Sequence, residues 1–373
     1  MSNIYLDSAA TTCIRPEVVR EMVRVLENDF GNPSSTHSFG RTAKNDMETS
    51  RKTIAKLLHC TAQELIFMGS ATEGTNWILK NAVQNMGIQC IITSRMEHHA
   101  TLYTVKQLEK EFGIEVLYVK HLPTGAVDMS DCVQLLMNGK KTLVSLMHVN
   151  NEIGTVLDVE KMSRLCKQHE ALFHCDTVQS VGKTELNLEE LPVDFIVASA
   201  HKFHGPKGVG FAFVRKGLVM QPMLYGGEQE KGLRAGTEGV HQVVGMAKAL
   251  ELSYLHLDHE RAYIASLKEY CAHQLFANFE GVKINGSDTF YNLLNILLPF
   301  SEEKTAMMLF TLDMKGIAVS RGSACQSGSN KPSHVLAEIL STEDLNKPTI
   351  RVSFSHYNTK EEIDTFISVL KEV

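Results

Sequence analysis

The 373-residue sequence predicts an α/β protein, with a large domain on a mainly parallel seven-stranded sheet and a smaller α+β domain. Two observations support this class. Seven short apolar runs alternate with amphipathic helical patterns between residues 16 and 214, which is typical of a parallel sheet covered by helices on both faces. A long helical stretch from Thr237 to about Ala277 then leads into shorter, mixed strand and helix patterns. The chain is also longer than an average single domain.

Each element follows from its local pattern. The strands of the large domain are predicted where apolar runs lie between turn residues, at 66–68, 91–93, 116–119, 142–147, 172–175, 195–198 and 209–214. The helices between them are predicted at 16–29, 42–58, 72–83, 100–112 and 159–169. We place the domain boundary near Leu255, inside the long helical stretch. Strands of the small domain are predicted at 282–284, 293–298, 317–319 and 350–354.

Lys202 is the most informative single residue. It lies in the stretch 199–208, which directly follows the apolar run 195–198, where a buried strand opens into a polar loop. Lysine is normally a solvated surface residue. Desolvation lowers the pKa of its amine and makes it a nucleophile toward aldehydes. Lys202 is therefore a candidate Schiff-base lysine for pyridoxal phosphate.

Upstream residues supply partners that such a cofactor needs. Asp176 ends the apolar run 171–175, and the carboxyl end of a strand faces the crevice where ligands of open α/β sheets bind. Its carboxylate would hold a ring nitrogen protonated, and Gln179 would donate to the phenolic oxygen. The alternative is that Asp176 caps a following helix.

A phosphate cup is predicted between a strand and a helix, over residues 69–76, with Ser70, Ala71 and Thr72 as binding residues. Small residues let the backbone approach an anion, hydroxyls donate to it, and the helix N-terminus attracts it. Ser199 and His201 would add donors beside Lys202. Taken alone, this turn resembles many ordinary helix starts.

Two adjacent histidines, His98 and His99, follow another apolar run. Either ring would suit stacking on a cofactor and proton transfer near neutral pH. Alternatives are an ordinary loop or a metal ligand, and His201 and His204 also have a ligand-like spacing. No Cys-x-x-Cys or His-Glu-x-x-His motif accompanies them, so no metal site is predicted.

With these motifs in place, the chain resembles the cysteine desulfurases, fold type I pyridoxal phosphate enzymes of the class V aminotransferase family with an aspartate aminotransferase-like fold. The resemblance runs nearly end to end. It is carried by ordered motifs at 5–12, 31–35, 70–73, 97–98, 149–154, 174–180, 199–202, 234–237, 322–325 and 350–353. One departure is Ser8, where family members usually carry a histidine.

The resemblance implies roles for individual residues. Lys202, Asp176 and Gln179 would hold the cofactor as described, and His98 rather than His99 would stack on its ring. The resemblance also implies that Thr237 reaches the phosphate of a neighbouring subunit in a homodimer, and that Asn151 and Arg351 bind the substrate carboxylate. It places residues 1–13 with 256–373 in the small domain, which leaves 14–255 for the large domain.

Cys325 separates a desulfurase from its relatives. Its segment, 320–333, is small and polar, and we expect it to be mobile, as in the group with a longer active-site loop. The other seven cysteines are interpreted as small buried hydrophobes, namely Cys13, Cys60, Cys90, Cys132, Cys166, Cys175 and Cys271.

The implied reaction converts L-cysteine to L-alanine and leaves the sulfur as a persulfide on Cys325. An acceptor protein in iron–sulfur cluster assembly or in tRNA or cofactor thiolation would then take it. A selenocysteine lyase or another class V aminotransferase is the alternative.

Composition adds exclusions. The formal net charge is −6, which gives no basic field for nucleic acid or for a membrane surface. The first residues lack the pattern of a secretory signal, and no apolar run is long enough to span a bilayer. Eight cysteines without framework spacing favour a reducing cytoplasm.

Overall fold

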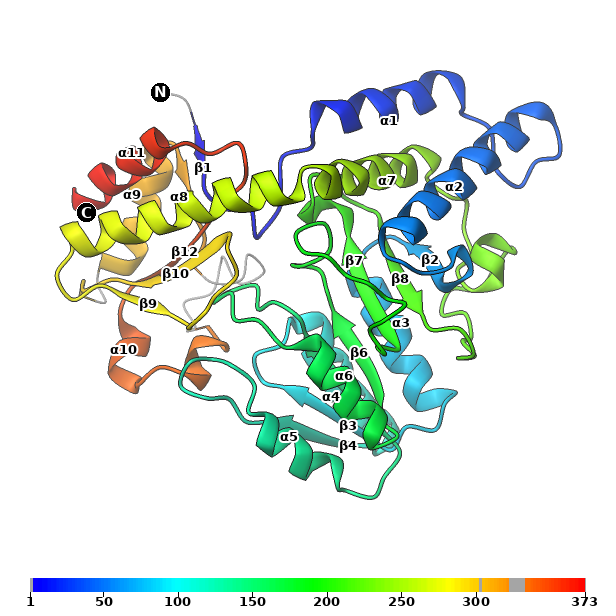
Figure 1. The fold of residues 1–373 in the computed structure, drawn as a ribbon, viewed down its shortest axis with the longest axis horizontal. Helices are drawn as coiled ribbons and strands as arrows, with labels where there is room; N and C mark the ends of the chain where they lie inside the picture. The colour runs from blue at the N-terminus through cyan, green and yellow to red at the C-terminus, as the bar shows by residue number, and fades with distance from the viewer. Residues whose placement is uncertain (1–2, 302–303, 322–332, 373) are drawn as a thin grey trace.

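The computed structural model describes residues 3–301, 304–321 and 333–372 (Figure 1). Its centre is a seven-stranded sheet with the order β2-β8-β7-β6-β5-β3-β4. The strands are β2 (Leu65–Met68), β3 (Cys90–Ser94), β4 (Glu115–Val119), β5 (Thr142–Met147), β6 (Leu172–Asp176), β7 (Phe195–Ser199) and β8 (Gly210–Val214). Only β8 runs against its two neighbours, so the predicted mainly parallel sheet of seven strands is confirmed.

Helices cover both faces of this sheet. They are α1 (Pro16–Asn28), α2 (Ser38–Leu57), α3 (Ala71–Gln84), α4 (His99–Phe112), α5 (Met129–Leu136), α6 (Val159–Gln168) and α7 (Val240–Leu255). Side chains of a strand alternate between two apolar clusters: Ile196 and Ala198 of β7 pack toward α1, α2, α6 and α7, whereas Phe195 and Val197 pack toward α3 and α4. The short helix α5 was not predicted from the sequence.

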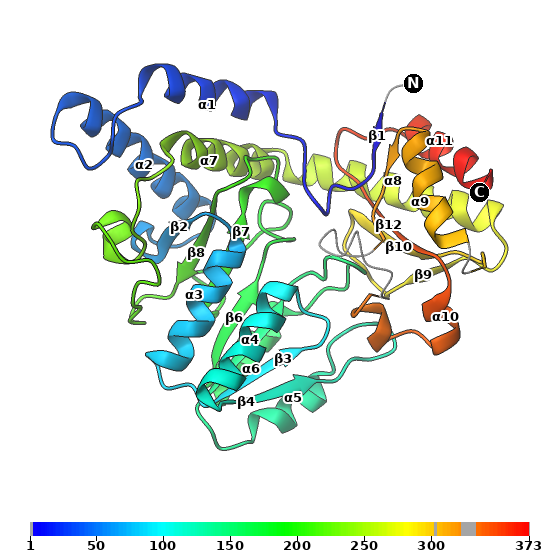
Figure 2. The ribbon, with the colours of Figure 1, turned by 180° about the vertical axis from the view of Figure 1, so that it is seen from behind.

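A second set of elements lies to one side of the seven-stranded sheet (Figure 2). Its buried side chains form their own apolar cluster. An antiparallel sheet has the order β12-β10-β9, from β9 (Lys283–Asn285), β10 (Leu293–Leu297) and β12 (Thr349–Ser353). The N-terminal strand β1 (Ile4–Tyr5) pairs in parallel with β11 (Ile317–Ala318). The helices are α8 (Leu257–Asn278), α9 (Lys304–Met314), α10 (Thr342–Asn346) and α11 (Lys360–Lys371). Short 3-10 helices connect elements throughout the chain: η1 (Ala62–Glu64), η2 (Ala200–Lys202), η3 (Gln229–Gly232) and η5 (Leu336–Glu338).

The long helical stretch of the sequence is two helices that run nearly end to end across the molecule (Figure 1). They are separated at His256, where α7 ends and α8 begins. The proposed domain boundary at Leu255 falls at this break. The Arg15 guanidinium at the start of α1 binds the Glu260 carboxylate of α8 at 2.7 Å, which joins the two parts. No helix in the described ranges is long and apolar enough to cross a membrane.

Candidate functional site

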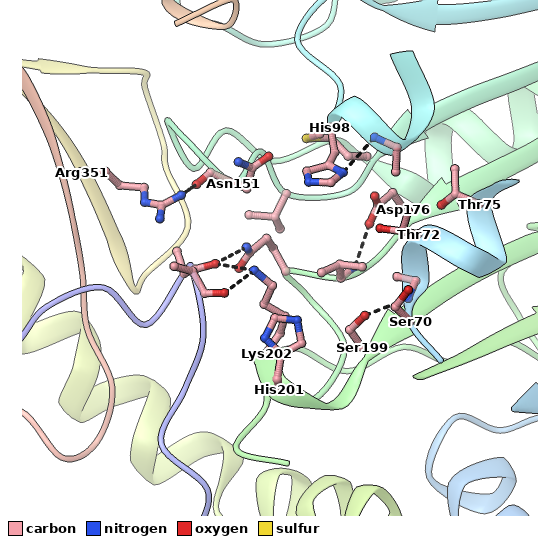
Figure 3. A pocket seen from close by; sticks show the side chains of 18 residues that line it. Ser70, Thr72, Thr75, His98, Asn151, Asp176, Ser199, His201, Lys202 and Arg351 are labelled. Carbon is pink, nitrogen blue, oxygen red and sulfur yellow. Dashed lines mark hydrogen bonds between the residues drawn. The ribbon is translucent and has the colours of Figure 1, made fainter. Parts of the chain in front are cut away.

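A cavity of about 270 Å³ lies at the carboxyl ends of β5, β6 and β7 (Figure 3). Most of the predicted site residues line it: Ser70, Ala71, Thr72, His98, Asn151, Asp176, Gln179, Ser199, His201, Lys202 and Arg351. Thr237 instead lines a separate cavity of about 280 Å³ with Arg234 and Glu238. Cys325 lies outside the described residues. The fold therefore brings together residues as far apart in the sequence as Ala9 and Arg351.

Lys202 extends into this cavity from η2, directly after β7 (Figure 3). Its Nζ donates to the backbone oxygens of Ala9 and Ala10, both at 2.8 Å. Those two residues belong to the segment between β1 and α1. The N-terminal segment thus fixes the direction of the amine that the sequence singled out.

Asp176 is the last residue of β6, and its side chain reaches the same cavity. Its Oδ1 accepts from the backbone N–H of Val178 at 3.0 Å. Residues 178–180 form a turn, so the alternative of a helix capped by Asp176 does not apply. Burial raises the pKa of this carboxyl to about 6, while Val178 N–H and the Lys202 amine oppose the rise. A cationic ring nitrogen would add a further stabilising partner for the carboxylate.

The N-terminus of α3 forms the anion cup. Ser70 caps it, since its side chain accepts from Glu73 N, and Ser199 Oγ accepts from Ala71 N at 2.8 Å. The Glu73 carboxylate accepts from Gly69 N at 2.8 Å and from Arg234 Nε at 2.9 Å. The positive end of the helix dipole makes this helix N-terminus suitable for a phosphate.

Thr75 lies within the predicted phosphate cup, but the sequence analysis did not name it as a binding residue. Its side chain is 1% exposed and lines the cavity next to Thr72 (Figure 3). The Thr75 hydroxyl has no hydrogen-bond partner among the described residues. A buried hydroxyl without a partner is unfavourable, so a cofactor oxygen here would satisfy it. Its spacing of three from Thr72, which puts both on one face of α3, is the signal that could have identified it.

The two adjacent histidines, His98 and His99, have different surroundings in the structure. His98 lines the cavity, and its Nδ1 accepts from Ala100 N at 3.1 Å, so the neutral ring carries its hydrogen on Nε2. Burial, followed by the nearby Lys202 charge, lowers its pKa to about 4. His99 stacks on Tyr103 with ring centres 4.8 Å apart and is not part of the cavity lining.

His201 also reaches the cavity, with Nδ1 at 3.2 Å from Thr11 Oγ1. Burial lowers its pKa to about 4, so it is a neutral group near pH 7. His204 turns away and binds the Cys13 carbonyl through Nδ1 at 2.9 Å. Within the described part of the chain, no three His, Cys, Asp or Glu side chains are grouped to hold a metal ion.

Arg351 enters from β12 on the opposite wall of the cavity (Figure 3). It is 1% exposed; Nη1 donates to the Asn151 carbonyl at 2.7 Å, and Nη2 pairs with Asp7 at 2.8 Å. Asp7 also accepts from Ser320 Oγ at 2.7 Å. The sequence placed Asp7 in a motif but did not predict that it orients this guanidinium.

Gln179 bridges two groups at the base of the cavity. Its Nε2 donates to the Ala9 carbonyl at 2.9 Å, and its Oε1 accepts from Lys183 Nζ at 3.2 Å. Lys183 was not predicted as a site residue. Its side chain is buried, which is unusual for lysine.

The described cysteines largely match their predicted role as small buried residues, with one correction. Cys90, Cys132, Cys166, Cys175 and Cys271 are buried and Cys60 is partly buried. Cys13 is exposed, which contradicts the prediction. Cys13 lies in the segment between β1 and α1. The backbone of this segment binds Lys202 and His204, whereas the Cys13 side chain faces solvent.

The side chains of this cavity fit pyridoxal phosphate. A lysine amine would bind its aldehyde carbon, and a buried carboxylate would face a ring nitrogen. The α3 N-terminus with the unsatisfied Thr75 hydroxyl would receive its phosphate.

Comparisons with known proteins show which family the chain resembles over its length. The family model described as "Aminotransferase class-V" matches residues 4–366. "Cysteine desulfurase IscS" of Dictyoglomus turgidum is 40% identical, over 99% of this chain and 94% of that protein. A solved "NIFS-LIKE PROTEIN" is similar with a TM-score of 0.91 and 35% identity, covering 100% of this chain and 99% of its own. The structure "SspA in complex with cysteine" has a TM-score of 0.83 and 29% identity, covering 96% and 100% of the two chains.

Proposed function

The chain belongs to the class V aminotransferase family, and from this premise we propose that it is a pyridoxal phosphate-dependent cysteine desulfurase. The observation that carries the proposal is one cavity that holds a lysine amine, a buried aspartate and a buried arginine together, at Lys202, Asp176 and Arg351. The relatives named cysteine desulfurase match nearly the whole chain. L-cysteine is the substrate and L-alanine the product.

Each part of the cofactor has a group to hold it. Ser70, Thr72, Thr75 and the α3 N-terminus would bind its phosphate, with Ser199 and His201 as further donors. Asp176 would keep its ring nitrogen protonated, Gln179 would donate to its phenolic oxygen, and His98 would lie against its ring. When bound, the cofactor accepts the electron pair that a substrate Cα–H bond releases.

The remaining steps belong to the chain's own residues. Arg351 Nε is buried without a partner among the described residues, and with Asn151 it would orient the substrate carboxylate. Lys202 Nζ would take the Cα proton of the bound substrate. His98, neutral with hydrogen on Nε2, would pass protons to and from the substrate.

We assign sulfur capture to Cys325. Its thiolate would attack the substrate Sγ, forming a sulfur–sulfur bond while the substrate Cβ–Sγ bond breaks and its electron pair stays with carbon. Protonation of that carbon gives L-alanine, and Cys325 keeps the sulfur as a persulfide. An acceptor protein in iron–sulfur assembly or thiolation would then receive this sulfur.

A single-turnover experiment tests this function. Purified protein loaded with pyridoxal phosphate is mixed with L-cysteine, and intact mass and alanine are measured. We expect one added sulfur atom on Cys325 and an equal amount of alanine. Alanine without the added sulfur would contradict the role of Cys325, and absence of both would contradict desulfuration.

The Cys325→Ser protein is the matched variant. It is expected to bind L-cysteine with a change in the visible spectrum, because the cofactor site is intact, but to release no sulfur. Lys202→Ala is expected to lose the covalently bound, reducible form of the cofactor. Sulfur release by the Cys325→Ser protein would contradict the assignment of Cys325 as the nucleophile.

We also propose a homodimer, in which Thr237 reaches the partner subunit's phosphate site. Val19, Val23 and Leu26 support it, because they form an exposed apolar stripe on α1 with exposures of 45, 42 and 55%. The stripe continues to Phe30, which is 71% exposed and stacks on Phe39 at 5.4 Å. We further propose a cytoplasmic location, a large domain of residues 14–255, and a small domain of residues 1–13 and 256–373.

A further inference from the structure

We propose that Lys183 is a positioning residue of the cofactor site, which sets the orientation of the Gln179 side-chain amide. The role rests on the pyridoxal phosphate site proposed above. Lys183 lies in the turn between β6 and β7, away from the lining of the main cavity. It therefore acts through Gln179 and not by contact with the cofactor.

The two ends of the Gln179 amide are chemically different, since Oε1 only accepts and Nε2 only donates hydrogen bonds. Lys183 Nζ, which in its ammonium form only donates, stands 3.2 Å from Oε1. The Ala9 carbonyl, which only accepts, stands 2.9 Å from Nε2. A flipped amide would put donor against donor and acceptor against acceptor. Only one orientation is therefore stable, and the second Nε2 hydrogen stays available to a cofactor oxygen.

The same contacts link the amide to Lys202. The Ala9 carbonyl accepts from Gln179 Nε2 and from Lys202 Nζ, at 2.9 and 2.8 Å. The order of contacts is Lys183, Gln179, Ala9 and Lys202. A rotation of the amide would remove one donor from the carbonyl that holds the Lys202 amine, so both cofactor-binding groups depend on Lys183.

The Lys183 side chain is buried, so it is not an ordinary solvated surface lysine. Lys183 is 8% exposed, and no salt bridge joins it to a carboxylate in the described ranges. Burial, followed by the charges of Lys202 and Arg351, lowers its pKa to about 7. The charged and titratable groups around it are Lys202, Arg351, His201, His204 and Glu260. Both Glu260 oxygens already bind Arg15, at 2.8 and 2.7 Å.

A second, small cavity explains how the amine is accommodated. Its volume is about 30 Å³, which suits one water molecule, and its polar lining includes Lys183, Ser8, His204, Asn292 and Ser355. Water at this place would accept the Lys183 hydrogens that do not reach Gln179. Lys183 thus joins this small polar cavity on one side to the cofactor-binding amide on the other.

A double-mutant cycle tests the role. The affinity for pyridoxal phosphate is measured by visible absorbance in wild type, Lys183→Met, Gln179→Leu and the double variant. We expect Lys183→Met to weaken binding by about fivefold, the value of one hydrogen bond, and to shift the visible band in the same direction as Gln179→Leu. In the Gln179→Leu background, Lys183→Met should cost nothing further, because its target is gone.

Lys248→Met, a substitution of a more exposed lysine on α7, is the matched control and should change neither affinity nor spectrum. The role would be overturned if Lys183→Met weakened pyridoxal phosphate binding equally in the wild-type and Gln179→Leu backgrounds. It would also be overturned if Lys183→Met weakened binding in neither background. If Lys183→Met does not fold, Lys183→Arg keeps a donor and should retain the wild-type band, and a shifted band would contradict the role. Wild-type protein that binds no pyridoxal phosphate would overturn the proposed function itself.

Discussion

The polar side chains of the site share one physical condition, which is that burial favours their neutral forms. It raises the pKa of Asp176 to about 6, and it lowers the pKa of His98 to about 4 and that of Lys183 to about 7. Charge here is costly until a partner of opposite sign arrives. A cofactor with a cationic ring nitrogen and an anionic phosphate supplies such partners. Binding and ionisation of the site are therefore coupled.

Asp176→Asn should change how the stability of the cofactor-free protein depends on pH. Because the folded pKa of about 6 exceeds the usual 3.8, the protonated carboxyl stabilises the fold at low pH, and this contribution is lost as pH rises through 6. The difference corresponds to roughly 3 kcal/mol. Relative to wild type, Asp176→Asn should gain about that much in free energy of unfolding between pH 4 and 7.

Denaturant unfolding of both proteins at several pH values measures this gain. The exposed substitution Asp258→Asn is the control and should show no such trend. A constant difference across the range would show that Asp176 is ionised throughout. With pyridoxal phosphate bound, the order should reverse, since Asn cannot neutralise the ring nitrogen.

Thr75→Val is expected to weaken binding of pyridoxal phosphate by about fivefold without destabilising the cofactor-free protein. The hydroxyl is buried and unsatisfied there, so its removal costs no hydrogen bond. Thr101→Val is a closely matched control, because Thr101 Oγ1 is also buried without a partner among the described residues but lies outside the cavity lining. Cofactor titration and thermal melting separate the two effects, and equal affinities for both variants would contradict the assignment.

At the scale of elements, the anion cup depends on how closely α3 packs on β7. Gly74 makes this approach possible, since a Cβ at that position would lie 2.9 Å from Val197 Cγ1. The same helix carries Ser70, Thr72 and Thr75 to the cavity. The position of the cup is thus fixed by a contact between a helix and a buried strand.

Gly74→Ala should therefore reduce both stability and cofactor affinity. Overpacking of this kind costs about 1–3 kcal/mol, and movement of α3 away from β7 would relieve it. Lys80→Ala, on a less buried position of the same helix, is the control for helix propensity. Melting temperature and affinity should fall together in Gly74→Ala, and an unchanged affinity would show that the strand moves instead of the helix.

At the scale of the whole molecule, the site is assembled from both parts of the fold. Lys202 and Asp176 come from the seven-stranded sheet, whereas Arg351 comes from β12 of the smaller sheet. The segment after β1 passes between them and supplies the Ala9 and Ala10 carbonyls. Displacement of the two parts would separate substrate-binding from cofactor-binding groups.

At the scale of the whole molecule we also predict that two chains assemble into a dimer through the α1 stripe. Leu26→Asp combined with Phe30→Asp should convert a dimer into monomers, because charges would replace exposed apolar groups of the α1 stripe. Met137→Asp, at a position that is 68% exposed elsewhere, is the control. Sedimentation equilibrium gives the mass, and cofactor affinity should fall with the dimer if Thr237 acts across it. A monomeric wild-type protein would contradict the proposal.

The sequence by itself determined the strands of the large sheet, because apolar runs that must be buried on both faces leave few alternatives. It also determined most of the cavity residues, since they follow strands whose carboxyl ends meet at one edge, as Asp176 and Lys202 do. Only the tertiary structure decided the parts that depend on contacts between distant segments. The pairing of Asp7 with Arg351, the unsatisfied Thr75 hydroxyl, the exposure of Cys13 and the buried Lys183 amine are of this kind. Local pattern does not encode them, because burial and hydrogen bonding of a side chain are set by whichever remote backbone packs against it.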